Sequence, residues 1–382
     1  MKKLLLFLFL ACSAFVLNGC TQTVAGLVGA NDKCVVIAKR AQIRSSNAVV
    51  AADLLEVSRG QTLEVLDEDT YEGEKWFNVR ALDSERTEGW IEARNVLRQS
   101  VMEKSQKLAD EDKDLTPQAA GQLRAATNLR LSPDRATDDN IMYKMQGGET
   151  FDILSWKHVP KAEDADDKDD KTKANAANQA NLSARARRRI EREANAPPQM
   201  DDKYDTWYKV RLDPSVSPAP AGWIYGKQVE LAVPSDIIFY RTGREFVAWH
   251  RLDNDSGESS TASFNGKGKD AAKEIKAGSW VILEKSGRIQ EPNGEEPDFD
   301  RILILGYEKE TQDHYKVYRS GNVKGFLPLR VSGTGDSRAF SVRLKGADGE
   351  IRELQFGTFK DARRHLKVNV PPDIPKDEKG GD

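Results

Sequence analysis

Few residues of this chain have the type and spacing needed for nucleophilic or metal chemistry. The chain has 3 cysteines and 4 histidines: Cys12, Cys20, Cys34, His158, His250, His314 and His365. The histidines lie far apart, without H-E-x-x-H or another zinc-site spacing, and no cysteine follows Cys34. Neither the G-x-S-x-G elbow nor the S-x-x-K motif of acyl-transfer enzymes occurs. The sequence therefore predicts a binding protein that is not an enzyme and needs no metal or cofactor; an enzyme with another mechanism is the alternative.

Two short tryptophan-containing motifs, called phrases here, each occur twice in the chain. EKWFNVR is followed by EGWIEA, and later DTWYKVR is followed by AGWIYG. The spacing inside each pair is nearly kept, from Trp76 to Trp90 and from Trp207 to Trp223. Two pairs of phrases in the same order indicate a repeated fold.

Strand alternation suggests which of these side chains could meet a ligand. Phe77 and Val79 point to one face of a strand and Trp76 to the other. A half-exposed tryptophan offers a flat apolar face and one hydrogen-bond donor, which suits a flexible peptide. The candidate ligand-binding residues are Trp76 and Trp207. The alternative is that each of these tryptophans only closes the edge of its domain under a neighbouring loop. The residues expected to be structural are Phe77, Val79, Trp90, Tyr208, Val210 and Trp223.

The elements that would position these residues are short strands. Runs of β-branched and aromatic residues, broken by turn residues, cover 34–98 and recur over 120–232. In both regions the order is an arginine-containing strand, G-x-T with an apolar strand, W-(F/Y)-x-V-R, and then G-W-I. This pattern predicts two all-β domains in tandem.

The motif set resembles the bacterial Src-homology-3 domain, a small five-stranded barrel. The first copy of the pattern falls on Ile43, Arg44, Gly60, Thr62, Trp76, Val79, Gly89 and Trp90. The second falls on Asn128, Leu129, Arg130, Gly148, Thr150, Trp207, Val210, Gly222 and Trp223. The resemblance implies two small barrels in tandem and makes peptidoglycan stem peptides the leading ligand class.

The N-terminus has the layout of a secretory signal over residues 1–19. MKKLLLFLFLACSAFVLNGC starts with two lysines, continues with an apolar run and is too short to span a bilayer. It resembles a bacterial lipoprotein signal at Leu17, Gly19 and Cys20. The resemblance implies that the Cys20 thiol forms a thioether to diacylglycerol and becomes the mature N-terminus. Cleavage near Cys12, with Cys20 incidental, is the alternative.

This signal predicts a location in the cell envelope. Thr21 replaces the aspartate that, by the same resemblance, retains lipoproteins at the inner membrane, so the expected site is the periplasmic face of the outer membrane. With Cys12 removed and Cys20 lipidated, Cys34 has no partner for a disulfide and is expected to be buried. The net charge of −3 argues against nucleic acid as a partner, since phosphate binding needs a basic face.

Two segments join or interrupt the predicted barrels. Ser100 and Glu103 form a capping-box pattern, which predicts a short polar helix from Val101 to Glu111 that acts as a spacer. Residues 157–203 contain too few apolar side chains to offset their ordering entropy and are predicted to be a disordered insertion. Because its acidic and basic halves are segregated, the insertion is either a docking arm or a solvated loop.

The last third of the chain is strand-rich and carries a weak third copy of the phrases. HYKVY lines up with WYKVR, and GFL with GWI, which predicts a divergent third barrel. An added hairpin is expected to turn at Asp348 and Gly349, and FKDARRHLKV to form a helical turn or two. The predicted organisation is a signal at 1–19, a tether at 20–33, barrels at 34–98 and 120–232, a helical linker at 99–119, a β-rich domain at 233–372 and a mobile tail at 373–382.

These observations predict a mainly β, lipid-anchored binding protein of the periplasm and cell envelope, whose barrels recognise peptidoglycan stem peptides. The alternative function is a structural adaptor that docks protein subunits of an envelope assembly through the C-terminal domain or the charged insertion. The expected partners are cell-wall peptides or envelope proteins, and the membrane through the lipid anchor. The oligomeric state is left open.

Overall fold

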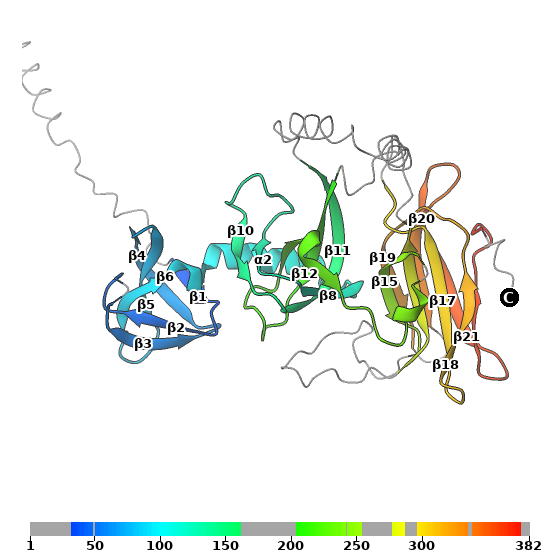
Figure 1. The fold of residues 1–382 in the computed structure, drawn as a ribbon, viewed down its shortest axis with the longest axis horizontal. Helices are drawn as coiled ribbons and strands as arrows, with labels where there is room; N and C mark the ends of the chain where they lie inside the picture. Colours follow the sequence, from blue (N-terminus) through cyan, green and yellow to red (C-terminus); the bar gives the residue numbers. More distant parts are fainter. Residues whose placement is uncertain are drawn as a thin grey trace, which may run out of the picture. The chain divides into compact units, whose positions relative to one another are not determined.

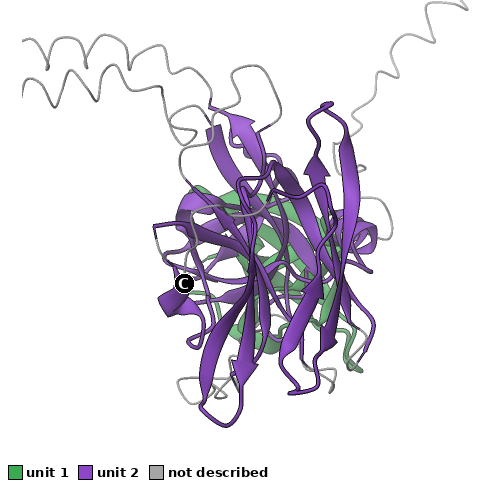
Figure 2. Ribbon diagram, turned by 90° about the vertical axis from the view of Figure 1, so that its right-hand side faces the viewer, with its two compact units in different colours: residues 1–102 green, residues 103–382 purple. Residues whose placement is uncertain are grey.

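The structure, a computed structural model, describes residues 32–48, 50–161, 204–241, 243–253, 277–286, 296–334 and 338–375. The chain divides into two compact units, Met1–Met102 and Glu103–Asp382 (Figure 2). The predicted signal, Cys20, most of the tether and most of the predicted insertion lie outside the described residues. The described residues are mainly strands, as predicted. No helix among them is long and apolar enough to cross a membrane.

The first unit contains one antiparallel sheet of 7 strands, coloured blue to cyan in Figure 1. Its strands are β1 (Lys33–Val36), β2 (Arg40–Arg44), β3 (Asp53–Ser58), β4 (Thr62–Tyr71), β5 (Glu74–Ala81), β6 (Glu88–Glu92) and β7 (Val96–Arg98). Their order across the sheet is β3-β2-β6-β5-β4-β1-β7. Phe77, Val79 and Ile91 pack with Cys34 in its core. Cys34 is completely buried, as predicted, and burial raises the pKa of its thiol to about 12.

The second unit opens with a sheet of the same design. Its strands are β8 (Ala119–Leu123), β9 (Thr127–Arg130), β10 (Ile141–Met145), β11 (Thr150–Pro160), β12 (Tyr204–Arg211), β13 (Ala221–Tyr225) and β14 (Val229–Leu231). Their order, β10-β9-β13-β12-β11-β8-β14, matches that of the first sheet position by position. The repeated phrases therefore fold into equivalent strand pairs, β5–β6 and β12–β13.

The first residues of the predicted insertion belong to a strand. Residues 157–160 continue β11, where Lys157 pairs with Trp207 and Pro160 with Tyr204. Pairing with β12 extends the strand through these residues, although their own composition is polar. Residues 162–203 lie outside the described part of the chain.

The predicted linker helix is present as α2 (Gln99–Glu111). It begins before Ser100, so Ser100 is a helical residue and not the expected N-cap. The expected spacer role does not describe Ser105, near the middle of the helix, which is completely buried against the second sheet.

The C-terminal part of the second unit is formed by two sheets of 4 antiparallel strands around one core (Figure 1). One sheet holds β15 (Glu245–Arg251), β16 (Trp280–Lys285), β17 (Arg301–Glu308) and β18 (Asp313–Arg319). The other holds β19 (Gly325–Ser332), β20 (Ala339–Lys345), β21 (Ile351–Lys360) and β22 (Leu366–Asn369). The predicted third barrel is wrong, because β18 and β19, which carry the HYKVY and GFL phrases, belong to different sheets.

Three smaller predictions concern the last strands. The expected hairpin is confirmed as β20–β21, and Gly349 in its turn has a φ of 82°, which favours glycine. The helical turn expected in FKDARRHLKV is wrong, since Leu366–Asn369 pairs with β21. The tail does not become free at residue 373: Ile374 is buried in the core, and the Gly321 amide donates to the Pro375 carbonyl at 2.7 Å.

Candidate functional site

The two tryptophans predicted to bind a ligand are buried. The exposed fraction is 3% for Trp76 and 1% for Trp207. The predicted half-exposed surface is therefore wrong for both.

The loop after β2 contacts the strand that pairs with Trp76. Trp76 pairs with Asp69 across the β4–β5 hairpin, and the Asn47 side chain donates to the Asp69 carboxylate at 2.6 Å. The Arg44 guanidinium lies 6.0 Å from the centre of the Trp76 ring. Strand alternation gave the correct face for Trp76, but it contains no information about this loop contact.

The equivalent loop, between β9 and β10, contacts Tyr225, which pairs with Trp207. The ring of Tyr225 lies 5.5 Å from that of Trp207, and the Arg135 guanidinium lies 4.7 Å from the Tyr225 ring. Asp205 ties this arrangement together, because it accepts a hydrogen bond from the Tyr225 hydroxyl at 2.9 Å. In each sheet a loop side chain therefore contacts a residue that pairs with the buried tryptophan: Asn47 contacts Asp69, and Arg135 contacts Tyr225.

The remaining residues of the phrases divide between core and surface. Phe77, Val79 and Val210 are buried, as predicted. Tyr208 is only half-buried, and its ring meets that of Trp156 edge-on at 5.9 Å. Trp90 and Trp223, expected to be structural, are the half-exposed tryptophans of the two pairs.

Trp90 belongs to a line of side chains on the outer face of the first sheet. Strand pairing sets Asp53, Arg44, Trp90, Asn78 and Asp67 side by side on β3, β2, β6, β5 and β4. We call these five residues the first polar row. Cross-strand partners on one face lie about 5 Å apart, so the row is a continuous surface.

The first polar row has hydrogen-bonding capacity left over. The Arg44 guanidinium contacts the Asp53 carboxylate at 3.4 Å. Oδ1 of Asn78 is buried and accepts no hydrogen bond within the described part of the chain. An acceptor buried without a partner costs free energy, which a donor supplied by a ligand would recover.

The second sheet carries an equivalent line with different chemistry. Ile141, Arg130, Trp223, Lys209 and Ser155 form the second polar row, on β10, β9, β13, β12 and β11. Both rows keep an arginine and a tryptophan at the same places. Asn78 of the first row is replaced by Lys209 in the second, and Asp67 by Ser155.

Helix α2 packs against the sheet that carries the second polar row. The Ser105 hydroxyl donates to the Ala221 carbonyl at 2.6 Å and accepts from the Ala221 amide at 3.2 Å. The Arg211 guanidinium donates to the backbone carbonyls of Asp112 and Leu115, at 2.7 and 3.2 Å, just beyond the helix. A cation at this end also interacts favourably with the helix dipole.

Lys209 completes this contact. Its ammonium lies 2.8 Å from the Glu111 carboxylate and 2.6 Å from that of Asp112. Burial opposes the charge on Lys209, but the hydrogen bonds to Asp112 and Glu111 outweigh it and raise the pKa of the lysine. The central polar group of the second row is thus satisfied within the chain, whereas its counterpart in the first row is not.

The histidines do not build a metal centre. His314 Nε2 lies 2.8 Å from the Gly278 carbonyl, and His365 Nε2 lies 2.7 Å from the Glu308 carboxylate. Within the described ranges, no three histidine, cysteine, aspartate or glutamate side chains gather closely enough to hold a metal ion.

Comparison with known proteins adds little to this geometry. No protein-family model matches the chain, and no curated protein matches it in sequence. The structures of NlpC2 and NlpC1 from Trichomonas vaginalis align with 91% of this chain, at 8% and 10% identity, and the alignments cover 95% and 92% of those proteins. The TM-score is 0.15 for each, so neither alignment supports a conclusion about fold or activity.

Proposed function

We propose that this chain is a lipid-anchored binding protein of the bacterial cell envelope. In this proposal the two seven-stranded sheets are Src-homology-3-like barrels in tandem, and the first recognises peptidoglycan stem peptides through its polar row. The repeated phrases and the lipoprotein-like signal support the family and the location. The equivalent strand orders of the two sheets are consistent with a duplicated domain.

One observation carries the choice of site. The first polar row combines the half-exposed Trp90 with Asn78, whose buried Oδ1 has no partner in the described structure. At the same places in the second sheet, Lys209 is held by Glu111 and Asp112. A flat aromatic surface beside an unused amide oxygen suits the backbone of an extended peptide.

The two half-exposed tryptophans allow a matched test. We expect Trp90→Ala to weaken binding of the full-length chain to purified sacculi about tenfold, as for loss of one aromatic anchor. Trp223→Ala, at the equivalent place in the second row, should leave binding within about twofold. The measurement is cosedimentation over a series of sacculus concentrations, with circular dichroism to confirm that both variants are folded.

Two results would reject this function. If the unmodified chain does not sediment with sacculi, peptidoglycan binding is wrong. If the two alanine variants bind equally well, the ligand does not use the first polar row.

The proposed anchor is tested separately. Two or three acyl chains hold a protein on a bilayer far more firmly than one. We expect Cys20→Ser to move the protein from the membrane fraction to the soluble periplasmic fraction, measured by immunoblotting after cell fractionation. Full retention of the variant in membranes would contradict lipidation at Cys20, while Cys34→Ser serves as the control.

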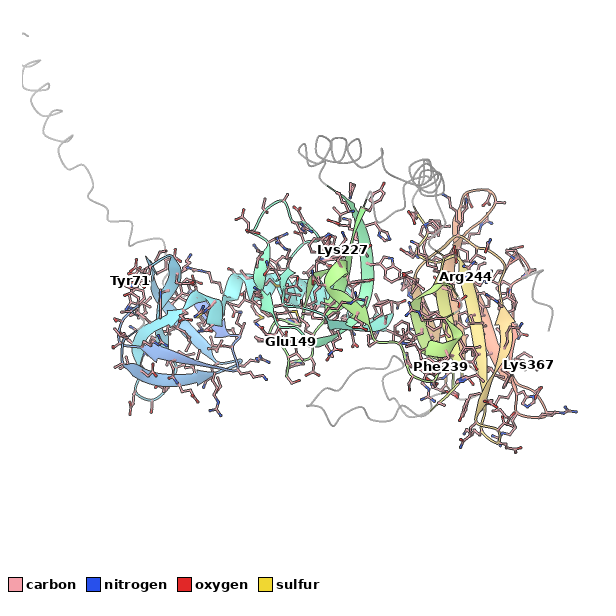
Figure 3. All side chains as sticks on the ribbon, in the orientation of Figure 1. Tyr71, Glu149, Lys227, Phe239, Arg244 and Lys367 are labelled. Atoms are coloured by element: carbon pink, nitrogen blue, oxygen red, sulfur yellow. The ribbon has the colours of Figure 1, made fainter. Side chains whose placement is uncertain are left out.

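A second candidate function has one specific observation in its favour. Phe239, labelled in Figure 3, is 86% exposed on a short turn (Ile238–Tyr240) of the C-terminal part. Ile237 beside it is fully buried, and Asp236 fixes the turn by accepting a hydrogen bond from the Trp280 indole at 2.8 Å. A rigidly held, exposed aromatic residue suits a protein interface, as expected of an adaptor that docks envelope subunits.

A further inference from the structure

We propose that the first polar row selects a primary ammonium group on its ligand. This inference rests on the proposed function, because it names the chemical group by which the same site recognises its peptide. The inference rests on three neighbouring members of the row, Trp90, Asn78 and Asp67. Each of them would interact favourably with the same kind of ligand group.

All three groups attract a positively charged N–H donor. Asp67 is exposed, and its carboxylate forms no ion pair with any described residue; it accepts only the Glu68 amide, at 2.8 Å. Oδ1 of Asn78 is an acceptor without a donor in the described structure, and rotation of the terminal amide can turn it toward a ligand. The face of the Trp90 indole carries the negative side of an aromatic quadrupole.

The spacing of the row suits a single ammonium. Adjacent antiparallel strands lie about 4.8 Å apart, so Asp67 and Trp90 stand about 10 Å apart with Asn78 between them. An ammonium placed above Asn78 is then about 5 Å from both neighbours. That distance lies within the roughly 6 Å range of a cation–π contact.

The charges around the row argue against a preference for a carboxylate group on the ligand. A ligand carboxylate would need a cation, but Arg44 already contacts Asp53 at 3.4 Å. Arg80, two residues after Asn78 on the same face, contacts Glu88 at 2.7 Å and Glu64 at 3.1 Å. A carboxylate at the centre of the row would therefore be repelled by Asp67 without gaining a new cationic partner.

The second sheet shows the same arrangement with the ammonium built in. Lys209 stands where Asn78 stands in the first row, beside Trp223. Its ammonium is buried between the sheet and the carboxylates of Glu111 and Asp112. The second row therefore supplies its own cation. The first row lacks that cation and has Asp67 in place of Ser155.

Chemically blocked sacculi test the inference. Acetic anhydride removes the charge of amino groups, and carbodiimide with ammonia removes that of carboxyl groups. We expect the full-length chain to bind acetylated sacculi at least about fivefold more weakly than untreated ones, and amidated sacculi equally well. Asp67→Asn should reduce binding to untreated sacculi about threefold and remove most of its dependence on salt. Glu85→Gln, an exposed carboxylate of the same unit outside the row, should change neither.

The outcomes separate this inference from the proposed function. Equal binding to untreated and acetylated sacculi, with a loss on Trp90→Ala, would overturn the ammonium preference and leave peptide binding intact. Absence of binding to untreated sacculi would reject the proposed function. In that case the ammonium preference is tested by titrating the chain with a lysine-containing tripeptide and with its Nε-acetylated form, while the indole signal of Trp90 is followed. A shift with the free amine alone supports the preference, and equal or no shifts reject it.

Discussion

Replacing Trp207 with alanine is expected to lower the free energy of unfolding of the second unit by about 3–5 kcal/mol. Trp207 is 1% exposed and packs on Tyr225 at 5.5 Å; Arg135 lies over the Tyr225 ring, and Asp205 accepts a hydrogen bond from the Tyr225 hydroxyl. Removing the indole leaves a cavity that these neighbours cannot fill without breaking their own contacts. Urea unfolding of the full-length chain, followed by circular dichroism, measures the loss.

Trp223 provides the matched control. It lies one strand away but is only half-buried, so Trp223→Ala should cost about 1 kcal/mol. Equal losses for the two variants would show that Trp207 is not the more deeply packed of the pair. If Trp207→Ala kept the stability of the wild type but lost sacculus binding, Trp207 would be a ligand-binding residue after all.

Acid should change the stability of the second unit through two groups on β11, Asp152 and His158, whose effects have opposite signs. Burial, with Lys285 nearby, lowers the pKa of His158 to about 4, and burial raises the pKa of Asp152 to about 6. Stability contributed by His158 is present above about pH 6.5 and is lost as the pH falls toward 4. The contribution of Asp152 is present below about pH 4 and is lost as the pH rises through 6.

Variants at these two positions should therefore diverge in acid. Between pH 7.5 and 4.5, we expect His158→Gln to gain about 2 kcal/mol of stability relative to wild type, and Asp152→Asn to lose about 2 kcal/mol. The measurement is the free energy of unfolding of each full-length variant at both pH values. Parallel pH profiles for wild type and both variants would contradict the burial of these groups.

The sequence predicted the strand content and the repetition because both depend on local patterns. The turns, the alternation within WFNVR and WYKVR, and the G-W-I phrases recur in each copy, and each falls on an equivalent strand. Phe77 and Val79 face the core because alternation alone determines that.

Other features depend on contacts between distant segments. Asn47, in the loop after β2, donates to Asp69, which pairs with Trp76, so this contact joins a loop to a strand that follows it in the chain. The prediction of a third barrel is wrong for a similar reason. HYKVY and GFL resemble the earlier phrases, but their strands β18 and β19 belong to different sheets. Short phrases specify a strand and do not specify its neighbour.

The contrast between the two polar rows could have been read from the sequence. WFNVR and WYKVR differ at Asn78 and Lys209, and a lysine at an otherwise matched position signals a different partner for that face. What the sequence could not provide was that partner, because Glu111 and Asp112 reach Lys209 only once α2 is packed on the sheet.

The most direct test of the central claim is to follow the tryptophan indoles during ligand binding. The full-length chain, labelled at its indole nitrogens, would be titrated with soluble peptide fragments released from sacculi, and each indole N–H signal recorded by nuclear magnetic resonance. The first polar row predicts a saturable shift of the Trp90 signal, while the signals of Trp223 and Trp207 stay in place. A Trp90 signal that remains unmoved while the fragments bind, or a larger shift at Trp223, would contradict it.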